Sequence, residues 1–299
     1  HGRLEGHRTV RVGDDVIEGA QIFLNVGARA AVPDLQGLSD VPYLTNVGIL
    51  ALDVLPEHLI VVGGSYVGLE FAQIYRRLGS RVTVVERSDR LIGREDEDTS
   101  TTLRQVLESE GIAFRLNATC ISLRRTASGV GVGVMCDDGT PEVEGSHVLI
   151  ATGRRPNTDD LGLAVAGVAT DSRGFITVDE QCRTNVPGVW ALGEANGRGA
   201  FTHTSYNDFE IVAAALFEGG RRALSDRIPC YALYTDPPVG RVGMTNREAR
   251  ASGRRVLVGY RPMSKVSRAR EMSETNGFMR VLVDADTKLI LGATIFGVG

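Results

Sequence analysis

Three small residues after a short apolar run have the spacing of a phosphate-binding turn. Residues 59–70 read LIVVGGSYVGLE, which places Gly63, Ser65 and Gly68 in a glycine-rich pattern. Gly63 would allow a tight turn from strand to helix, Ser65 replaces the glycine that usually lets backbone approach pyrophosphate, and Gly68 would let the helix pack closely. The helix N-terminus would then present N–H groups to phosphate. A generic βαβ turn is the alternative.

An acidic residue after the next apolar run bears on the choice of cofactor. The segment RVTVVE at 81–86 predicts a second strand that ends in Glu86, where a carboxylate can accept hydrogen bonds from the adenosine ribose. A carboxylate repels a 2′-phosphate, so the sequence favours NAD(H) over NADP(H). Arg87 and Arg90 follow closely and could hold that phosphate instead, or could be solvated surface residues.

Two side chains share one face of the first predicted helix. Tyr66 and Glu70 lie four residues apart, at the mouth of the predicted nucleotide site. Both could act near the nicotinamide. Alternatively, Tyr66 only packs against the sheet and Glu70 is a surface charge.

The four cysteines do not form a local redox or metal motif. Cys120, Cys136, Cys182 and Cys230 have no CxxC or CxxxxC spacing. This pattern argues against a dithiol pair or a zinc knuckle and favours reduced cysteines in a cytoplasmic protein. We expect no metal site.

The pattern along the chain predicts the elements that position these residues. The runs at 8–12 and 21–26, split by a turn-rich GDD, are typical of a small antiparallel element. From His58 to Gly153 strands alternate with helices, and a helix is predicted over about 203–218. The closing segment FMRVLVDADTKLILGATIFG predicts a hairpin whose last strand would be an unpaired sheet edge, which suggests a fragment.

Composition excludes several classes of protein. The 299 residues are 42% hydrophobic and 23% charged, as in globular proteins, and no apolar run is long enough to span a membrane. The net charge of −4 provides no basic field for nucleic acid. No signal-peptide core is visible, so a cytoplasmic enzyme is expected.

Several motifs in series resemble those of the class I pyridine nucleotide-disulfide oxidoreductases, which include dihydrolipoamide dehydrogenase, glutathione reductase and mercuric reductase. The resemblance is carried, in order, by GGSYVGLEFAQ, VTVVERSDRLIGREDED, ATGRRPNT, ALGEANGRGAFTH, YTDPPVGRVGMT and GFMRVLVD. It covers essentially the whole chain and is closest to mercuric-reductase-like, FAD-containing oxidoreductases of bacteria.

The resemblance implies an α/β fold of Rossmann-like FAD- and NAD(P)-binding domains, each a doubly wound parallel sheet with a β-meander, plus a truncated α+β dimerisation domain. It implies that residues 1–27 are the tail of the first FAD segment and 28–153 the NAD(P) domain. Residues 154–226 would be the second FAD segment and 227–299 the first part of the dimerisation domain. The family's CxxxxC pair, its C-terminal His–Glu pair and its first FAD glycine motif are not in this sequence.

Several roles follow from the resemblance at matching positions. Glu194, after Gly193, stands where an Asp carboxylate holds the FAD ribityl chain, and the extra methylene puts that contact in doubt. Tyr66 resembles an aromatic lid over the flavin, and Glu70 a helix carboxylate whose lysine partner is missing. The helix that starts near Thr202 would point its positive end at the flavin, with Thr202 as a possible N-cap. The cofactor-binding candidates are Gly63, Gly64, Ser65, Tyr66, Val67, Gly68, Glu70, Glu86, Arg87, Ile121, Ala151, Thr152 and Gly153 for NAD, and Gly27, Gly193, Glu194, Phe201, Thr202 and His203 for FAD.

The resemblance implies an oxidoreductase that passes hydride from NAD(P)H to FAD and then electrons to a disulfide, a metal ion or a similar acceptor. The parent protein would be a homodimer, and the isolated chain is expected to be inactive, without a catalytic residue of its own. Two alternatives remain open: a non-catalytic nucleotide-binding module, and a flavin reductase without a redox disulfide.

Overall fold

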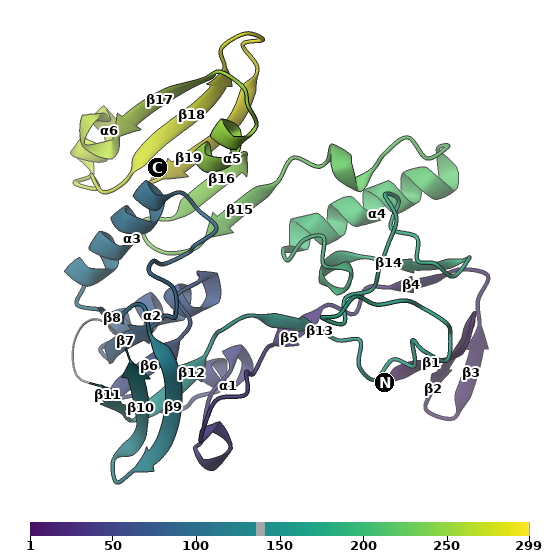
Figure 1. Cartoon of the computed structure of the whole chain (residues 1–299), viewed down its shortest axis with the longest axis horizontal. Helices are drawn as coiled ribbons and strands as arrows, with labels where there is room; N and C mark the ends of the chain where they lie inside the picture. The colour runs from purple at the N-terminus through teal and green to yellow at the C-terminus, as the bar shows by residue number, and fades with distance from the viewer. Residues whose placement is uncertain (136–140, 299) are drawn as a thin grey trace. The chain divides into compact units, whose positions relative to one another are not determined.

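The chain forms two compact units in a computed structural model that describes residues 1–135 and 141–298 (Figure 1). The first unit comprises His1–Ala31 and Arg154–Arg227, and the second comprises Val32–Gly153 and Ile228–Gly299. Each unit is therefore built from two segments that are distant in the sequence.

Short strands and one long helix form the first unit. Strands β1 (Gly2–Gly6), β2 (Thr9–Val12) and β3 (Asp15–Glu18) make an antiparallel meander. The sequence-distant strands pair as β4 (Ile22–Leu24) with β14 (Val189–Ala191), in parallel, and as β5 (Ala28–Ala30) with β13 (Arg154–Pro156), antiparallel. The remaining elements are η2 (Gly193–Asn196), α4 (Thr202–Phe217) and η3 (Leu224–Asp226).

A four-stranded parallel sheet forms the centre of the second unit. Its order is β12-β6-β7-β8, with β6 (His58–Val62) and β7 (Arg81–Val85) in the middle and β12 (His147–Ile150) and β8 (Ala113–Arg115) outside. All five residues of β6 are buried, as expected for an inner parallel strand. The elements around it are η1 (Leu38–Asp40), α1 (Asn46–Leu50), α2 (Tyr66–Leu78), α3 (Glu97–Ser109) and the meander of β9 (Thr119–Thr126), β10 (Gly129–Met135) and β11 (Glu142–Gly145).

A five-stranded antiparallel sheet completes the second unit (Figure 1). Its order is β15-β16-β19-β18-β17, from β15 (Cys230–Leu233), β16 (Val239–Gly243), β17 (Val256–Pro262), β18 (Phe278–Asp284) and β19 (Ile290–Phe296). Its phenylalanines Phe278 and Phe296 belong to the same apolar cluster as Leu69 of α2 and Leu103 of α3. The short helices are α5 (Asn246–Ala251), η4 (Met263–Lys265) and α6 (Ser267–Glu271).

The predicted α/β class is confirmed, and two strand predictions are wrong. The run at 9–12 pairs with 15–18 across the GDD turn, whereas Ile22–Leu24 joins β14 in another sheet. The last strand, β19, is not an edge, because it lies between β16 and β18. Pairing partners far away in the sequence decide both cases.

None of the helices formed by residues 1–135 and 141–298 is both long and apolar enough to cross a membrane.

Candidate functional site

The glycine turn between β6 and α2 is packed so closely that side chains would not fit. Gly63 has φ +120°, and a Cβ there would lie 2.4 Å from the carbonyl oxygen of Ala151. A Cβ on Gly68 would lie 2.1 Å from the carbonyl oxygen of Gly63. Ser65 is the N-cap residue of α2, and its side chain makes no capping hydrogen bond. The Ser65 side chain therefore does not compete with an anion for the N–H groups of the first turn.

Glu86 lies against this turn. Its Oε2 accepts a hydrogen bond from the Gly64 N–H at 2.6 Å, and its Oε1 accepts one from the Ser88 N–H at 2.8 Å. A Cβ on Gly64 would lie 2.9 Å from Leu91 Cδ2 and 3.0 Å from Glu86 Cβ, so a side chain at residue 64 would force these neighbours to shift. The structure thus brings the predicted phosphate turn and the predicted ribose carboxylate together.

The other predicted residues of the NAD site lie in the same turn or in the segments next to it. Val67 is in the first turn of α2, and Ala151, which donates its N–H to Val62 O at 2.8 Å, leads to the exposed Thr152 and Gly153. Arg87 is exposed, and the partly buried Ile121 in β9 packs against a cluster that contains Val62 and Val85, the last residues of β6 and β7.

One face of α2 is bonded to the segment around β15 and β16. The Glu70 carboxylate accepts the Tyr234 N–H at 2.9 Å, and burial raises the pKa of Glu70. Gln73 exchanges two hydrogen bonds with the Asp236 backbone, at 2.7 and 2.8 Å, and Arg77 pairs with the Asp236 carboxylate at 2.6 Å. Glu70 is therefore not a simple surface charge.

Tyr66 lies on the same face of α2 and contacts a buried ion pair, Glu95–Arg241, that sequence reasoning missed. Its hydroxyl donates to Glu95 Oε1 at 2.8 Å, and burial, reinforced by the Glu95 charge, raises the pKa of Tyr66. Arg241 of β16 donates to both Glu95 oxygens, at 2.7 and 3.2 Å. Glu95 and Arg241 lie far apart in the sequence, and no local pattern signals their contact.

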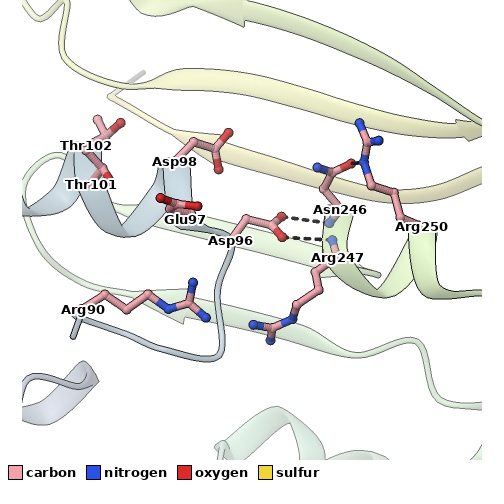
Figure 2. A pocket seen from close by; sticks show the side chains of 9 residues that line it. All are labelled: Arg90, Asp96, Glu97, Asp98, Thr101, Thr102, Asn246, Arg247 and Arg250. Atoms are coloured by element: carbon pink, nitrogen blue, oxygen red, sulfur yellow. Dashed lines mark hydrogen bonds between the residues drawn. The ribbon is translucent and has the colours of Figure 1, made fainter. Parts of the chain in front are cut away.

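A hollow of about 750 Å³ lies between α3 and α5 (Figure 2). Its lining residues are Arg90, Asp96, Glu97, Asp98, Thr101, Thr102, Asn246, Arg247 and Arg250. The Asp96 carboxylate accepts the Asn246 and Arg247 N–H groups and pairs with the buried Arg280 at 2.6 Å. Arg280 also pairs with Asp98, at 2.6 Å. Asp96 and Asp98 therefore connect α3 to α5 and to β18 through these contacts. Of the residues predicted to contact a cofactor, only Arg90, the alternative phosphate ligand, lines this hollow.

In the first unit, Glu194 is anchored by an arginine that the motif contained but the sequence analysis did not single out. Arg154 directly follows Gly153, pairs with the Glu194 carboxylate and donates to the Ala28 carbonyl at 2.6 Å. Gly193 has φ +67°, and its N–H donates to the buried Asp208 at 2.8 Å. Gly27, with φ +66°, accepts the Asn157 N–H at 3.0 Å.

The start of α4 differs from the prediction. Phe201 is the N-cap residue, and Thr202 already lies within the helix. The hydroxyl of Thr204 accepts the Phe201 N–H at 3.1 Å, so the interpretation of Thr202 as the N-cap is wrong. The Phe201 and His203 rings stack with 5.2 Å between their centroids.

The cysteines that the structure describes lie on separate elements. Cys120 is exposed in β9, Cys230 is partly buried in β15, and Cys182 is buried in the first unit. Burial, with the Asp208 charge, raises the pKa of Cys182 to about 12, so this thiol stays protonated. Cys136 lies outside the described residues. Among the described residues, no three His, Cys, Asp or Glu side chains are grouped to hold a metal ion.

Comparison with known proteins identifies the family. The model of the pyridine nucleotide-disulphide oxidoreductases matches residues 1–219, and that of their dimerisation domain matches residues 230–299. The chain belongs to this family. Its members use FAD and NAD(P)H, the two predicted cofactors.

Similar proteins include enzymes with different acceptors. The chain is 35% identical over 95% of its length to a probable pyridine nucleotide-disulfide oxidoreductase, RclA, from Escherichia coli, and covers 64% of it. It is 34% identical over 96% of its length to mercuric reductase from Streptomyces lividans, covering 60% of that protein. The chain thus spans about three fifths of the length of these curated relatives.

Solved structures agree with the fold. The structure of the HOCl-induced flavoprotein disulfide reductase RclA from Escherichia coli matches 99% of this chain and 68% of its own, with a TM-score of 0.91 and 34% identity. LpdA from Mycobacterium tuberculosis matches 97% of this chain and 63% of its own, with a TM-score of 0.85 and 28% identity.

Proposed function

We propose that this protein is an FAD-dependent oxidoreductase that takes hydride from NADH and delivers electrons to a disulfide, a metal ion or a similar acceptor. The observation that carries the proposal is the contact between Glu86 and Gly64 at the phosphate turn, since it joins a ribose ligand to a phosphate cradle. The family and the names of its relatives support the acceptor class.

The second unit supplies a fitting nicotinamide-dinucleotide site. The close approaches at Gly63 and Gly68 keep the first turn of α2 near the strand ends. There a pyrophosphate would accept hydrogen bonds from the N–H groups of this turn. The Glu86 carboxylate would accept the ribose hydroxyls and disfavour a 2′-phosphate. Ala151, Thr152 and Gly153 would line the nicotinamide half, because they directly follow β12 beside this turn.

The first unit supplies residues that fit part of an FAD site. Arg154 pairs with the Glu194 carboxylate and holds it in place, while Asp208 accepts the Gly193 N–H and holds that turn. Glu194 would accept hydrogen bonds from the ribityl hydroxyls, and the N-terminal end of α4 would stabilise negative charge on the flavin. When bound, NADH supplies a hydride and FAD accepts it.

The partner of this chain is expected to be a second copy. Residues 230–299 match the family's dimerisation domain, whose sheet exposes apolar side chains such as Leu257, Tyr260 and Ile295. We therefore propose a homodimer assembled through this segment.

Titration of the purified chain with NADH and ADP-ribose tests the nucleotide part, and saturable binding of both is expected. In protein of the full family length, anaerobic NADH should then bleach the flavin absorbance. A chain that binds neither NADH nor ADP-ribose would contradict the proposal. Binding of NADH and FAD without bleaching would favour the non-catalytic module.

A further inference from the structure

The Tyr66 ring is tied to a buried carboxylate beside the phosphate turn. Tyr66 is the first residue of α2, and its hydroxyl donates to Glu95, which is 3% exposed. Glu95 lies in the segment between β7 and α3, and that segment is joined to the turn by the hydrogen bond from Ile92 N–H to Gly64 O at 2.9 Å. The ring is therefore held toward the segment that follows β7.

Glu95 does not depend on Tyr66 for its charge balance. Arg241 donates Nε and Nη2 to the two Glu95 oxygens, and its Nη1 donates to Gly243 O at 2.6 Å. The Arg241 guanidinium also lies 4.5 Å from the centroid of the Tyr231 ring. If the Tyr66 hydroxyl leaves, the buried Glu95 carboxylate keeps its cation Arg241, so no unpaired buried charge results. Of the hydrogen bonds that Glu95 accepts, the one from Tyr66 is therefore less costly to break than those from Arg241.

Tyr66 stands where a bound dinucleotide would cross α2. Under the proposed function, Glu86 fixes the adenosine half at the end of β7, and the nicotinamide half extends past the N-terminus of α2 toward the end of β12. The bond to Glu95 draws the ring toward the segment after β7 instead of toward β12. A ring released from this bond can turn into the space of the nicotinamide half.

We propose that Glu95 is a positioning residue that holds the Tyr66 ring clear of the nicotinamide half of the site, with Arg241 fixing Glu95. This inference rests on the proposed function. The raised pKa of Tyr66 keeps its hydroxyl a donor across the neutral pH range.

The test compares NADH with ADP-ribose, which lacks the nicotinamide ring. Tyr66→Phe removes only the hydroxyl, and we expect the Kd for NADH to rise about 3- to 10-fold while that for ADP-ribose stays unchanged. Glu95→Gln should shift NADH in the same direction. The double variant should show no more than the larger single effect, because both changes release the same ring.

Tyr75→Phe is the matched control. Tyr75 lies on the same helix, and its hydroxyl donates to Ile49 O at 2.7 Å, away from Glu95. Its loss should leave the ratio of the two Kd values unchanged. Because Glu95→Gln can also weaken folding, thermal unfolding accompanies each titration, and Tyr66→Phe carries the decision.

The outcomes separate this inference from the proposed function. An unchanged or lowered Kd for NADH in Tyr66→Phe would overturn the role of Glu95 alone, as would an equal shift for ADP-ribose or for the Tyr75→Phe control. A wild-type chain that binds neither nucleotide would overturn both.

Discussion

Glu86 uses both carboxylate oxygens to accept backbone N–H groups, from Gly64 and from Ser88. A ribose hydroxyl can share these acceptors, whereas a 2′-phosphate would place negative charge against them. We therefore expect NADH to bind more tightly than NADPH by about 1–3 kcal/mol, and Glu86→Gln to reduce this preference. Parallel calorimetric titrations of the two nucleotides measure it.

The control for this preference is Glu108→Gln, which changes an exposed carboxylate on α3 that pairs with Arg104. It should leave the NADH-to-NADPH ratio unaltered. Equal affinities in the wild-type chain, or tighter NADPH, would indicate that Arg87 or Arg90 controls this end of the site.

Sequence could predict residues whose role depends on local spacing, and not those whose role depends on distant packing. Gly63, Gly68 and Glu86 follow from one strand–turn–helix–strand unit, in which backbone geometry fixes each position. Glu95 and Arg241 meet across 146 residues, and Asp208 meets Gly193 only after α4 folds back. A charged residue in a sequence does not show whether it will be buried or which residue it will pair with.

At the scale of elements, the same distinction applies. The helix predicted after the glycine turn is observed as α2, Tyr66–Leu78, which Ser65 precedes as N-cap and the left-handed Gly79 ends. Strand pairing was harder to predict, as β19 shows: the sequence predicts its hairpin with β18, which is confirmed, but not its pairing with β16. Pairing register is a tertiary property.

The approach of α2 to β6 gives a prediction for one glycine. Gly68→Ala places a methyl group 2.1 Å from the Gly63 carbonyl oxygen, so α2 must move away from β6. We expect a loss of about 1–3 kcal/mol or more in the free energy of unfolding and loss of NADH binding. Denaturant unfolding and NADH titration measure the two effects.

Gly93→Ala is the matched control for this change. Nothing lies within 4 Å of a Cβ at Gly93, so the variant should fold and bind NADH normally. If Gly68→Ala also bound NADH normally, close helix–strand contact would not be what shapes the phosphate turn.

At the scale of the whole molecule, buried charges join the segment with the proposed nucleotide site to the segment that matches the dimerisation domain, both in the second unit. Glu95 and Asp96 directly precede α3, and their partners Arg241 and Arg280 belong to β16 and β18 of the five-stranded sheet. Each arginine is less than a tenth exposed, so neither pair is screened as a surface pair would be. The two segments should therefore unfold together.

Arg280 offers the sharpest test of this joining. It is 4% exposed, contacts Asp96 and Asp98, and lies 5.4 Å from the Phe278 ring centroid. Arg280→Leu leaves the buried Asp96 carboxylate without this cation, and we expect a loss of about 3–5 kcal/mol in the free energy of unfolding. Arg255→Leu, which removes an exposed pair with Asp286, is the control and should have little effect. Urea unfolding followed by far-UV circular dichroism measures both variants. Equal stability of the two would mean that apolar packing around Phe278, and not the buried arginine, holds the segments together.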